Sequence, residues 1–404
     1  MNDDAFTITK VIVIGSADVI KLCAIRAVGE FGCHVDAIHM VDDCKKRVEP
    51  IDRYSRYIDN YFFVDKAKEG SLTQFLLDNY TNSKEKLIII TLDDYSTFII
   101  DKSRDILGER FLFAHSGNEG GLTELMNKNL MKVLAKESGL NVVEGWPILF
   151  ENGDYKIPGG IKYPCFIKGL YSYNISKTIQ KRCDSEEELV SFLNLCKRQF
   201  PHSVYAEEFI QIDKEFGVIG VCDGDKSIIP AEAELLVLGQ GANHGVSMLG
   251  QIKPLDSNNV LCQSIECLLS KLHYVGIFNV DFVESNGRVF FVELNFRFAA
   301  YGYGLMRAGV NLPALFINVI TNAFNKDIRT QLDGEYYYMN EKIALINLIN
   351  GSISMAEYKA MKRKADFLMV SDKNDSKPQR FFAKRYFMRY LKSRLKKIKK
   401  CNNS

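Results

Sequence analysis

The sequence predicts a mixed α/β and α+β fold that opens with a Rossmann-like parallel α/β domain. The apolar run 11–14 meets Gly15, and helical periodicity then leads to a second apolar run at 35–39, which is the pattern of strand, helix and parallel strand. Residues 87–91 form another buried-strand pattern. Strand patterns then predominate from 204 to 295, so a larger region with antiparallel sheets should follow.

Length and composition indicate a globular protein of two or three domains. The chain has 404 residues, 47% hydrophobic and 25% charged, and it lacks the run of roughly 18 apolar residues that a membrane span needs. Its acidic start has neither the basic region nor the apolar stretch of a secretory signal, so a cytoplasmic location is expected. Ten single cysteines without a C-x-x-C pair argue against a zinc site or a disulfide scaffold.

Charge is distributed unevenly along the chain. From Lys377 onward there are 11 Lys or Arg residues and no acid, which leaves 41 basic and 50 acidic residues elsewhere. Nucleic-acid binding by the body is therefore not expected. Apolar residues recur at helical spacing within the tail, which fits either peripheral contact of residues 377–400 with an anionic membrane or packing onto the body: Phe387, Leu391, Leu395 and Ile398.

Two features that follow the first strands have alternative interpretations. Gly15 could begin a dinucleotide loop, but the pattern G-x-G-x-x-G is absent. Asp93 and Asp94 follow a buried parallel strand, beyond which ligands of such sheets bind. The same residues could instead cap the helix expected over 95–106.

Lysines and acids occur at the borders of other expected elements. Lys128 and Lys132 lie on a helix over 124–138, and Lys168 ends a short strand over 163–167. A strand is expected over 204–210, where it is interrupted by Glu207 and Glu208. Three further helices are expected over 186–199, 260–272 and 314–324.

A β-hairpin is predicted around Ser285-Asn286-Gly287, which two apolar strands flank. Glu293, Asn295 and Arg297 share one face of the second strand because side chains alternate with period two. Burial of an unpaired carboxylate is very costly, so a cation must approach Glu293. Arg297 could be that cation, in which case the face would hold a buried ion pair only.

The turn decides whether Asp281 joins this face. A two-residue turn pairs 285 with 288 and places Asp281 on the opposite face, unless a bulge compensates. A three-residue loop with a left-handed Gly287 makes Asp281 the diagonal neighbour of Glu293. We expect the three-residue loop, because two carboxylates and an amide oxygen then form a hard-oxygen site suited to Mg²⁺.

Asp281, Val-Glu-Leu-Asn-Phe-Arg at 292–297 and Arg-Ala-Gly-Val-Asn-Leu-Pro at 307–313 resemble the ATP-grasp superfamily. Within it, the chain is similar to the branch of D-aspartate ligase, pyrrolysine-pathway ligase and carbamoyl-phosphate-synthase-like enzymes. The resemblance implies a Rossmann-like domain, a two-subdomain ATP-grasp domain with a lid, and a C-terminal extension with a basic helical tail: residues 1–118, 119–328 with the lid at about 145–208, and 329–404.

The resemblance also implies roles for individual residues. Asp281, Glu293 and Asn295 match the ligands of the Mg²⁺ ions that bridge the ATP phosphates, and Mn²⁺ would suit the same oxygens. Lys128 and Lys168 match the two nucleotide lysines. A hinge strand and a later acid match the residues that hold adenine and ribose: Glu207, Glu208, Phe209, Ile210 and Glu215.

Two loops complete the implied site. Residues 241–247, with His244, resemble a glycine-containing hairpin near the acceptor site. Residues 169–177 resemble the flap that covers the phosphates, although they hold one glycine where backbone amides usually approach phosphates closely. Side chains such as Ser176 could replace those contacts, so Ser176 and His244 are candidates for substrate contact.

The implied activity is ATP-dependent ligation of a small carboxylate to an amine. The carboxylate attacks the γ-phosphate to give an acylphosphate and ADP, and the amine then displaces phosphate. Such transfer needs charge neutralisation and alignment, for which Arg297 is the catalytic candidate. Arg307 could hold a substrate carboxylate or lie on a helix surface. Homodimers are common among the relatives.

Two other functions remain open at this point. A carbamoyl-phosphate-synthase-like activity on a small acid such as bicarbonate is disfavoured because the chain lacks duplicated halves. A non-catalytic ATP-binding scaffold is favoured only by the unusual flap. Membrane contact through the tail would suggest a role in cell-envelope or surface-glycan metabolism.

Overall fold

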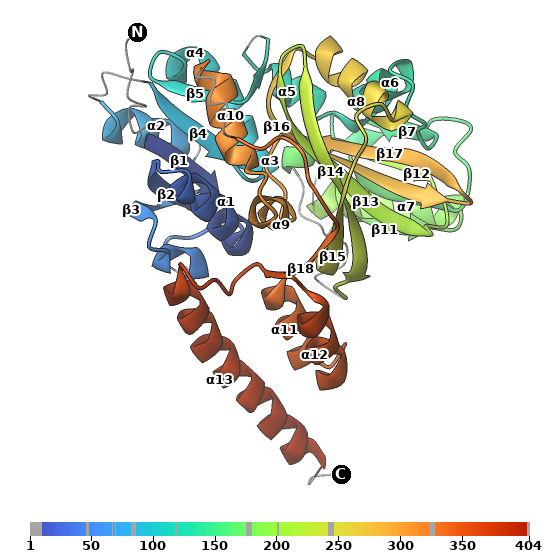
Figure 1. The fold of residues 1–404 in the computed structure, drawn as a ribbon. Coiled ribbons are helices and arrows are strands. Elements are labelled where there is room, and N and C mark those ends of the chain that lie inside the picture. Colours follow the sequence, from blue (N-terminus) through green and yellow to red (C-terminus); the bar gives the residue numbers. More distant parts are fainter. Residues whose placement is uncertain are drawn as a thin grey trace.

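The fold combines a parallel sheet, a small lid sheet, a large central sheet and a group of C-terminal helices (Figure 1). The computed structural model describes residues 10–45, 48–66, 68, 70–81, 86–117, 119–174, 180–199, 202–240, 246–322 and 328–401. Within these ranges, the side chains of residues 174, 199 and 391–401 are not described.

The N-terminal part is a five-stranded parallel sheet in the order β3-β2-β1-β4-β5. Its strands are β1 (Lys10–Gly15), β2 (His34–Val41), β3 (Ile58–Asp65), β4 (Leu87–Thr91) and β5 (Phe111–Phe113). Its helices are α1 (Asp18–Glu30), η1 (Ile51–Tyr54), α2 (Ser71–Asn79), α3 (Asp94–Lys102) and α4 (Arg104–Leu107). This confirms the Rossmann-like start that the hydrophobic pattern predicts.

Both faces of this sheet are buried, as continuous apolar strands require. Val11 and Val13 pack with α1 on one face, whereas Ile12 and Ile14 pack with α2 and α3 on the other. The strand order changes direction between β1 and β4, so the crevice beyond their carboxyl ends is where ligands of such sheets bind. Asp93 and Asp94 lie at this edge because they directly follow β4.

The segment that the resemblance implies to be a lid forms a four-stranded antiparallel sheet in the order β11-β10-β12-β7, with one helix packed on it, and we call this sheet and helix the lid. Its elements are β7 (Gly145–Ile148), β10 (Cys165–Gly169), β11 (Lys181–Cys183), α7 (Glu186–Gln199) and β12 (Val204–Glu208). A short turn η2 (Ser172–Asn174) follows β10, and a small hairpin pairs β8 (Phe150–Glu151) with β9 (Asp154–Tyr155).

The central sheet runs in the order β17-β16-β13-β14-β15-β18-β19, with β6 added beside β16. Its strands are β6 (His115–Ser116), β13 (Lys214–Asp223), β14 (Ser227–Leu238), β15 (Ser247–Pro254), β16 (Tyr274–Ser285), β17 (Arg288–Asn295), β18 (Tyr336–Met339) and β19 (Phe367–Leu368). Its helices are α5 (Gly121–Leu125), α6 (Lys128–Glu137), α8 (Val260–Lys271), α9 (Gly302–Arg307) and α10 (Leu312–Thr321). The side chains of α6 and α8 share a hydrophobic core with β16 and β17. Those of α9 and α10 belong to a different core, which they share with α1.

The hairpin turn between β16 and β17 differs from the one we expected. Ser285 pairs with Arg288, and Asn286 and Gly287 have φ angles of 50° and 72°, so the turn has two residues in left-handed conformations. The expectation of a three-residue loop is therefore wrong. Asn-Gly is the preferred pair for a two-residue type I′ turn, and Ser285 stays within its strand.

A bulge at Val292 returns Asp281 to the same face of the hairpin as Glu293, which the two-residue turn alone would not do. Phe282 pairs with Phe291, but the next pair is Asp281 with Glu293, so Val292 is the extra residue. The Phe291 N–H donates to the Asn141 carbonyl at 2.8 Å, outside the hairpin. Asp281 thus becomes the direct partner of Glu293 rather than its diagonal neighbour.

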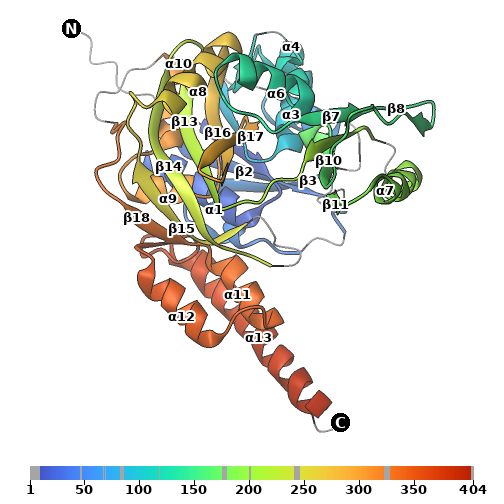
Figure 2. The same cartoon turned by 90° about the vertical axis from the view of Figure 1, so that its right-hand side faces the viewer.

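Three helices form the C-terminal part: α11 (Glu341–Asn350), α12 (Met355–Lys364) and α13 (Ser376–Cys401). Figure 2 shows them together below the sheets, with α13 extending beyond the body. Because β18 and β19 pair within the central sheet, the region after 329 is partly built into that sheet. Among the described residues, none of the helices has the length and apolarity that crossing a membrane requires.

Candidate nucleotide and metal site

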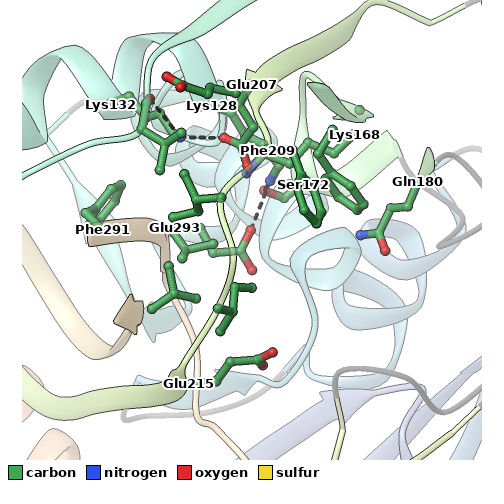
Figure 3. Close-up of a pocket in the computed structure, with 18 of the residues that line it drawn as sticks. Lys128, Lys132, Lys168, Ser172, Gln180, Glu207, Phe209, Glu215, Phe291 and Glu293 are labelled. Atoms are coloured by element: carbon green, nitrogen blue, oxygen red, sulfur yellow. Dashed lines mark hydrogen bonds and ion pairs between the residues drawn. The ribbon is translucent and has the colours of Figure 1, made fainter. Parts of the chain in front are cut away.

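A cavity of about 690 Å³ opens between the lid, the edge of the central sheet and α6. Figure 3 shows three lysines and two glutamates converging on it: Lys128, Lys132, Lys168, Glu207 and Glu293. Its volume falls within the range of roughly 300–1,000 Å³ that is typical of small-molecule sites.

α6 supplies two of these lysines because they are four residues apart on one helix face. The helix starts where the Asn127 side chain accepts the N–H groups of Asn129 and Leu130. Both lysines are buried, Lys128 with 9% and Lys132 with 4% of its surface exposed. Cations this deep need carboxylate partners.

Glu207 on β12 meets two of the lysines. Lys168 Nζ lies 2.7 Å from Glu207 Oε1, and Lys132 Nζ forms an ion pair with Oε2. Burial opposes the charged carboxylate, but Lys168 and Lys132 outweigh it and lower the pKa of Glu207. Burial is also the main reason why the pKa of Lys132 falls to about 8. Two lysines share one carboxylate, so the cluster leaves a net positive charge at the cavity.

Glu293 on β17 is paired with Lys128, whose Nζ lies 3.0 Å from Oε2. The charge of Lys128 is the main reason why the pKa of Glu293 is lowered. The alternative ion pair between Glu293 and Arg297 is therefore absent from these described side chains. Arg297 Nε instead donates to Asp94 Oδ1 at 2.7 Å, and Nη2 donates to Asn295 Oδ1 at 3.1 Å.

Asp281 lies directly across the hairpin from Glu293. Burial first, and the Glu293 charge second, raise the pKa of Asp281. Asn279 Nδ2 and Asn295 Nδ2 donate to its two oxygens at 2.8 and 2.9 Å. The two carboxylates therefore repel each other, and two amides support one of them.

This donor set fits Mg²⁺. Two carboxylates and one amide provide the hard oxygen ligands that the ion prefers, and a divalent cation would relieve their repulsion. The amide of Asn295 must turn over to ligate, because its Nδ2 currently faces both carboxylates. No group of three or more His, Cys, Asp or Glu side chains able to hold a metal occurs among the residues the structure describes.

The two aspartates after β4 divide the two roles suggested for them, a helix cap and a residue at the ligand-binding edge of the sheet. Asp93 caps α3 by accepting the Ser96 N–H, and it also accepts the N–H and Oγ–H of Ser16. Asp94 lines the cavity and holds Arg297. Asp94 thus brings the switch point of the parallel sheet into contact with the cavity.

The structure brings most of the predicted site residues to one place. Glu208, Phe209, Ile210 and Glu215 also line the cavity, whereas Asp281 and Asn295 neighbour Glu293 without lining it. Arg307 is not among its lining residues and instead lies 3.5 Å from both Glu30 and Asp372. His244 and Ser176 lie outside the described residues.

Sequence reasoning left Lys132 without a role and gave Asp94 only an open alternative. The spacing of Lys128 and Lys132 could have indicated a shared face, but nothing local identifies Glu207 as a partner. The sequence of the segment after β10 also does not indicate its long-range contacts. Its Ser172 Oγ accepts from Lys128 Nζ at 3.2 Å, and Tyr173 stacks on Phe98 of α3 with ring centroids 4.2 Å apart.

Comparison with known proteins places the fold. No protein-family profile matches the chain, and no curated protein sequence matches it. N5-carboxyaminoimidazole synthetase from Staphylococcus aureus, solved with ADP, is similar at a TM-score of 0.61 and 15% identity, over 85% of each chain.

Two further solved structures are similar. The biotin carboxylase domain of the Hydrogenobacter thermophilus 2-oxoglutarate carboxylase, solved as a dimer with MgADP, ADP and bicarbonate, gives a TM-score of 0.60 at 17% identity, over 81% of this chain and 73% of that one. L-amino acid ligase from Bacillus licheniformis gives 0.55 at 13% identity, over 81% and 79%. At these identities the likeness is one of fold, and that fold is the ATP-grasp fold.

Proposed function

We propose that this chain, which has the ATP-grasp fold, is an ATP-dependent carboxylate-amine ligase that acts through an acylphosphate. One observation carries the proposal. Lys128 and Lys168 from two different elements converge on a cavity beside the Asp281-Glu293 pair, next to Asp94 and Arg297 at the switch point of the parallel sheet. A triphosphate needs the lysines, and its metal needs the carboxylates.

ATP is assigned to the cavity with its base on the lid side. Phe209 and Ile210, directly after β12, provide apolar surface, and Glu207 and Glu208 precede them. The phosphates are directed toward Lys128 and Lys168. When bound, Mg²⁺ would be held by Asp281, Glu293 and Asn295 and would offset charge on the phosphates. Mn²⁺ suits the same oxygens.

The chemistry follows from charge and alignment. A carboxylate oxygen attacks the γ-phosphorus, the bond to the bridging oxygen breaks, and ADP leaves. Arg297 is placed to stabilise the transferring phosphoryl group, because Asp94 fixes its guanidinium by accepting a hydrogen bond from Nε. The amine then attacks the acyl carbon, loses a proton and expels phosphate. The lid and the Tyr173 segment would exclude water that otherwise hydrolyses the acylphosphate.

The named neighbours support a reaction of this class. One is named as an L-amino acid ligase and another as a carboxyaminoimidazole synthetase, and two were solved with ADP. The carboxylase neighbour, solved with bicarbonate, keeps a small inorganic acid as the second candidate substrate. We favour an organic carboxylate, and bicarbonate is included in the test below.

The test measures ADP release from ATP and Mg²⁺ with panels of amino acids and small acids, bicarbonate among them. We expect ADP only when a carboxylate and an amine are both present. Asp281→Ala and Glu293→Ala should abolish it, whereas Asp225→Ala, which changes an exposed turn residue, should not. If both site variants keep full turnover, the metal site is wrongly assigned. ATP binding without turnover on any pair would favour a scaffold.

Other expectations remain predictions. These are the domain boundaries at 118 and 328, action in the cytoplasm, a homodimer, contact of residues 377–400 with an anionic membrane, and a pathway in cell-envelope or surface-glycan metabolism. The roles of Arg307, His244 and Ser176 in substrate binding are also untested. Arg307 would have to leave Glu30 and Asp372 to contact substrate in the cavity.

A further inference from the structure

The first turns of α13 are fastened to the N-terminal domain along one helix face. Phe382 and Tyr386 are buried, with 6% and 2% of their surface exposed. Phe381 stacks on Tyr54 of η1 at 4.3 Å between ring centroids, and Arg385 Nη1 donates to the Glu49 carbonyl at 2.6 Å. This face already has its partner within the chain.

The base of α13 is also fixed. Asp375, directly before the helix, accepts hydrogen bonds from Arg26 Nε at 3.0 Å, Ser55 Oγ at 2.8 Å and the Arg56 N–H at 2.9 Å. Arg26 is fully buried. The helix therefore leaves the body in a set direction, and Figure 1 shows it extending well past the sheets.

A second face of α13 has large apolar side chains in solvent. Phe387 is 60% exposed and Met388 is 50% exposed. Both follow the buried Tyr386 directly, so the helical turn of about 100° per residue carries them away from the docked face. Exposed basic side chains stand next to them, Lys384 before and Arg389 after.

The charge of this region has one sign. From Lys377 to the C-terminus the sequence contains 11 Lys or Arg residues and no acid. Beyond the described side chains, the sequence continues the apolar spacing of Phe387 at Leu391, Leu395 and Ile398. A basic helix that carries an apolar stripe is the pattern of an interfacial membrane helix.

We propose that α13 seats the protein on an anionic lipid surface, with Phe387 and Met388 entering the boundary between headgroups and acyl chains. The exposed Lys384 and Arg389 lie at the level of the lipid phosphates, and the sequence supplies further positive charge after them. Two copies of this tail would repel each other, so a second copy of the chain is the poorer occupant. Because the hydrogen bonds of Asp375 fix the start of α13 to the body, a membrane-bound α13 would hold the body in one orientation to the lipid surface.

This inference specifies the expected membrane contact and does not depend on ligase activity. The test is co-sedimentation of the full chain with vesicles of phosphatidylcholine alone or mixed with phosphatidylglycerol. We expect binding only to the mixed vesicles, and weaker binding as salt rises, because screening reduces the attraction. Binding that ignores lipid charge and salt, or no binding, would overturn the proposal.

Variants then test the assigned face. Phe387→Ser with Met388→Ser, and separately Lys384→Glu with Arg389→Glu, should each weaken binding at least about tenfold. Leu195→Ser, which removes an apolar residue 46% exposed on the lid helix α7, is the matched control and should bind as the unaltered chain does. Undiminished binding by the first two variants refutes the assigned face.

Two accompanying measurements distinguish lipid binding from a subunit interface and keep the membrane proposal separate from the ligase proposal. If Phe387→Ser with Met388→Ser converts a dimer into a monomer and leaves vesicle binding unchanged, the face is a subunit interface and the proposal fails. ADP release without vesicles should be equal in the unaltered chain and in both α13 double variants. Its absence from the unaltered chain as well would count against the ligase and leave the vesicle result standing.

Discussion

Asp281 and Glu293 face each other across β16 and β17, and their surroundings shift the pKa values of the two carboxyl groups in opposite directions. Lys128 stabilises the Glu293 carboxylate, whereas burial and the Glu293 charge destabilise that of Asp281. A site that holds a divalent cation is expected to store such repulsion while it is free of metal. The residue types alone indicated this donor set, but the division of charge between the two carboxylates depends on Lys128, 165 residues away.

Replacing Asp281 with Asn should stabilise the protein while removing turnover. The raised pKa of Asp281 means that the folded state keeps a proton that the unfolded chain has lost, so this group lowers stability as pH rises from the ordinary Asp range toward neutrality. Asp281→Asn should raise Tm at neutral pH by about 1–3 °C. Asn279 can turn over its amide, because its Oδ1 is unpartnered.

The measurement is thermal unfolding followed by fluorescence, with Asp225→Asn as an exposed control that should leave Tm unchanged. A lower Tm for Asp281→Asn would show that its carboxylate is satisfied without metal, contrary to the account.

Lys132 gives a pH dependence of opposite sign. Its pKa is about 8 in the folded protein against 10.5 for an exposed lysine, mainly through burial. Between these values the unfolded chain binds the additional proton, so this group adds stability as pH rises. The Tm of the unaltered chain minus that of Lys132→Met should therefore grow across this range. A difference that is constant with pH would contradict the lowered pKa.

At the scale of elements, periodicity predicted the parallel sheet and the hairpin, but not the hairpin register. The Asn286-Gly287 pair favours the two-residue turn that the structure has, but nothing in the local sequence indicates the bulge that brings Asp281 opposite Glu293. At the bulge the Phe291 N–H bonds to the Asn141 carbonyl, about 150 residues away in the chain, which local sequence does not indicate. Lys132 was missed for the same reason, since Glu207 joins it only through the fold.

The segment after β10 is a second element whose role comes from long-range packing. Tyr173 stacks on Phe98 with an interplanar angle of 7°, which ties the glycine-poor flap to the N-terminal domain. We expect Tyr173→Ala to raise KM for ATP about tenfold and to increase ADP release without an amine, because the loosened flap admits water.

Tyr173→Phe keeps the aromatic ring and is the matched variant, which should behave as the unaltered chain. Both are measured by ADP release with and without the amine. If Tyr173→Ala leaves KM and the amine dependence intact, the stack is not part of the closure.

At the scale of the whole molecule, a buried cation is one of the links between the C-terminal region and the N-terminal domain. Arg26 donates to Asp375 and to the carbonyls of Met369 and Val370. No sequence pattern indicated this link, because its partners are more than 340 residues apart. The basic tail therefore begins at a segment that is hydrogen-bonded to the core, in keeping with the packing alternative for its first turns.

Asp375→Ala should lower the free energy of unfolding by about 3–5 kcal/mol, because Arg26 stays buried without its carboxylate. Chemical denaturation measures this, with Asp333→Ala as the control for an exposed pair with Arg329 that contributes at most about 1 kcal/mol. Proteolysis should also begin near residue 375 in the variant. Equal stability of the two variants would refute the anchor.

In the proposed reaction, one carboxylate oxygen of the substrate becomes part of the released phosphate. With a carboxylate substrate labelled with a heavy oxygen isotope, each amide formed should place one labelled oxygen in inorganic phosphate, detected by mass spectrometry. This follows because the acylphosphate gives up its bridging oxygen with the leaving phosphate. Amide formation without label in phosphate would exclude the acylphosphate and contradict the account.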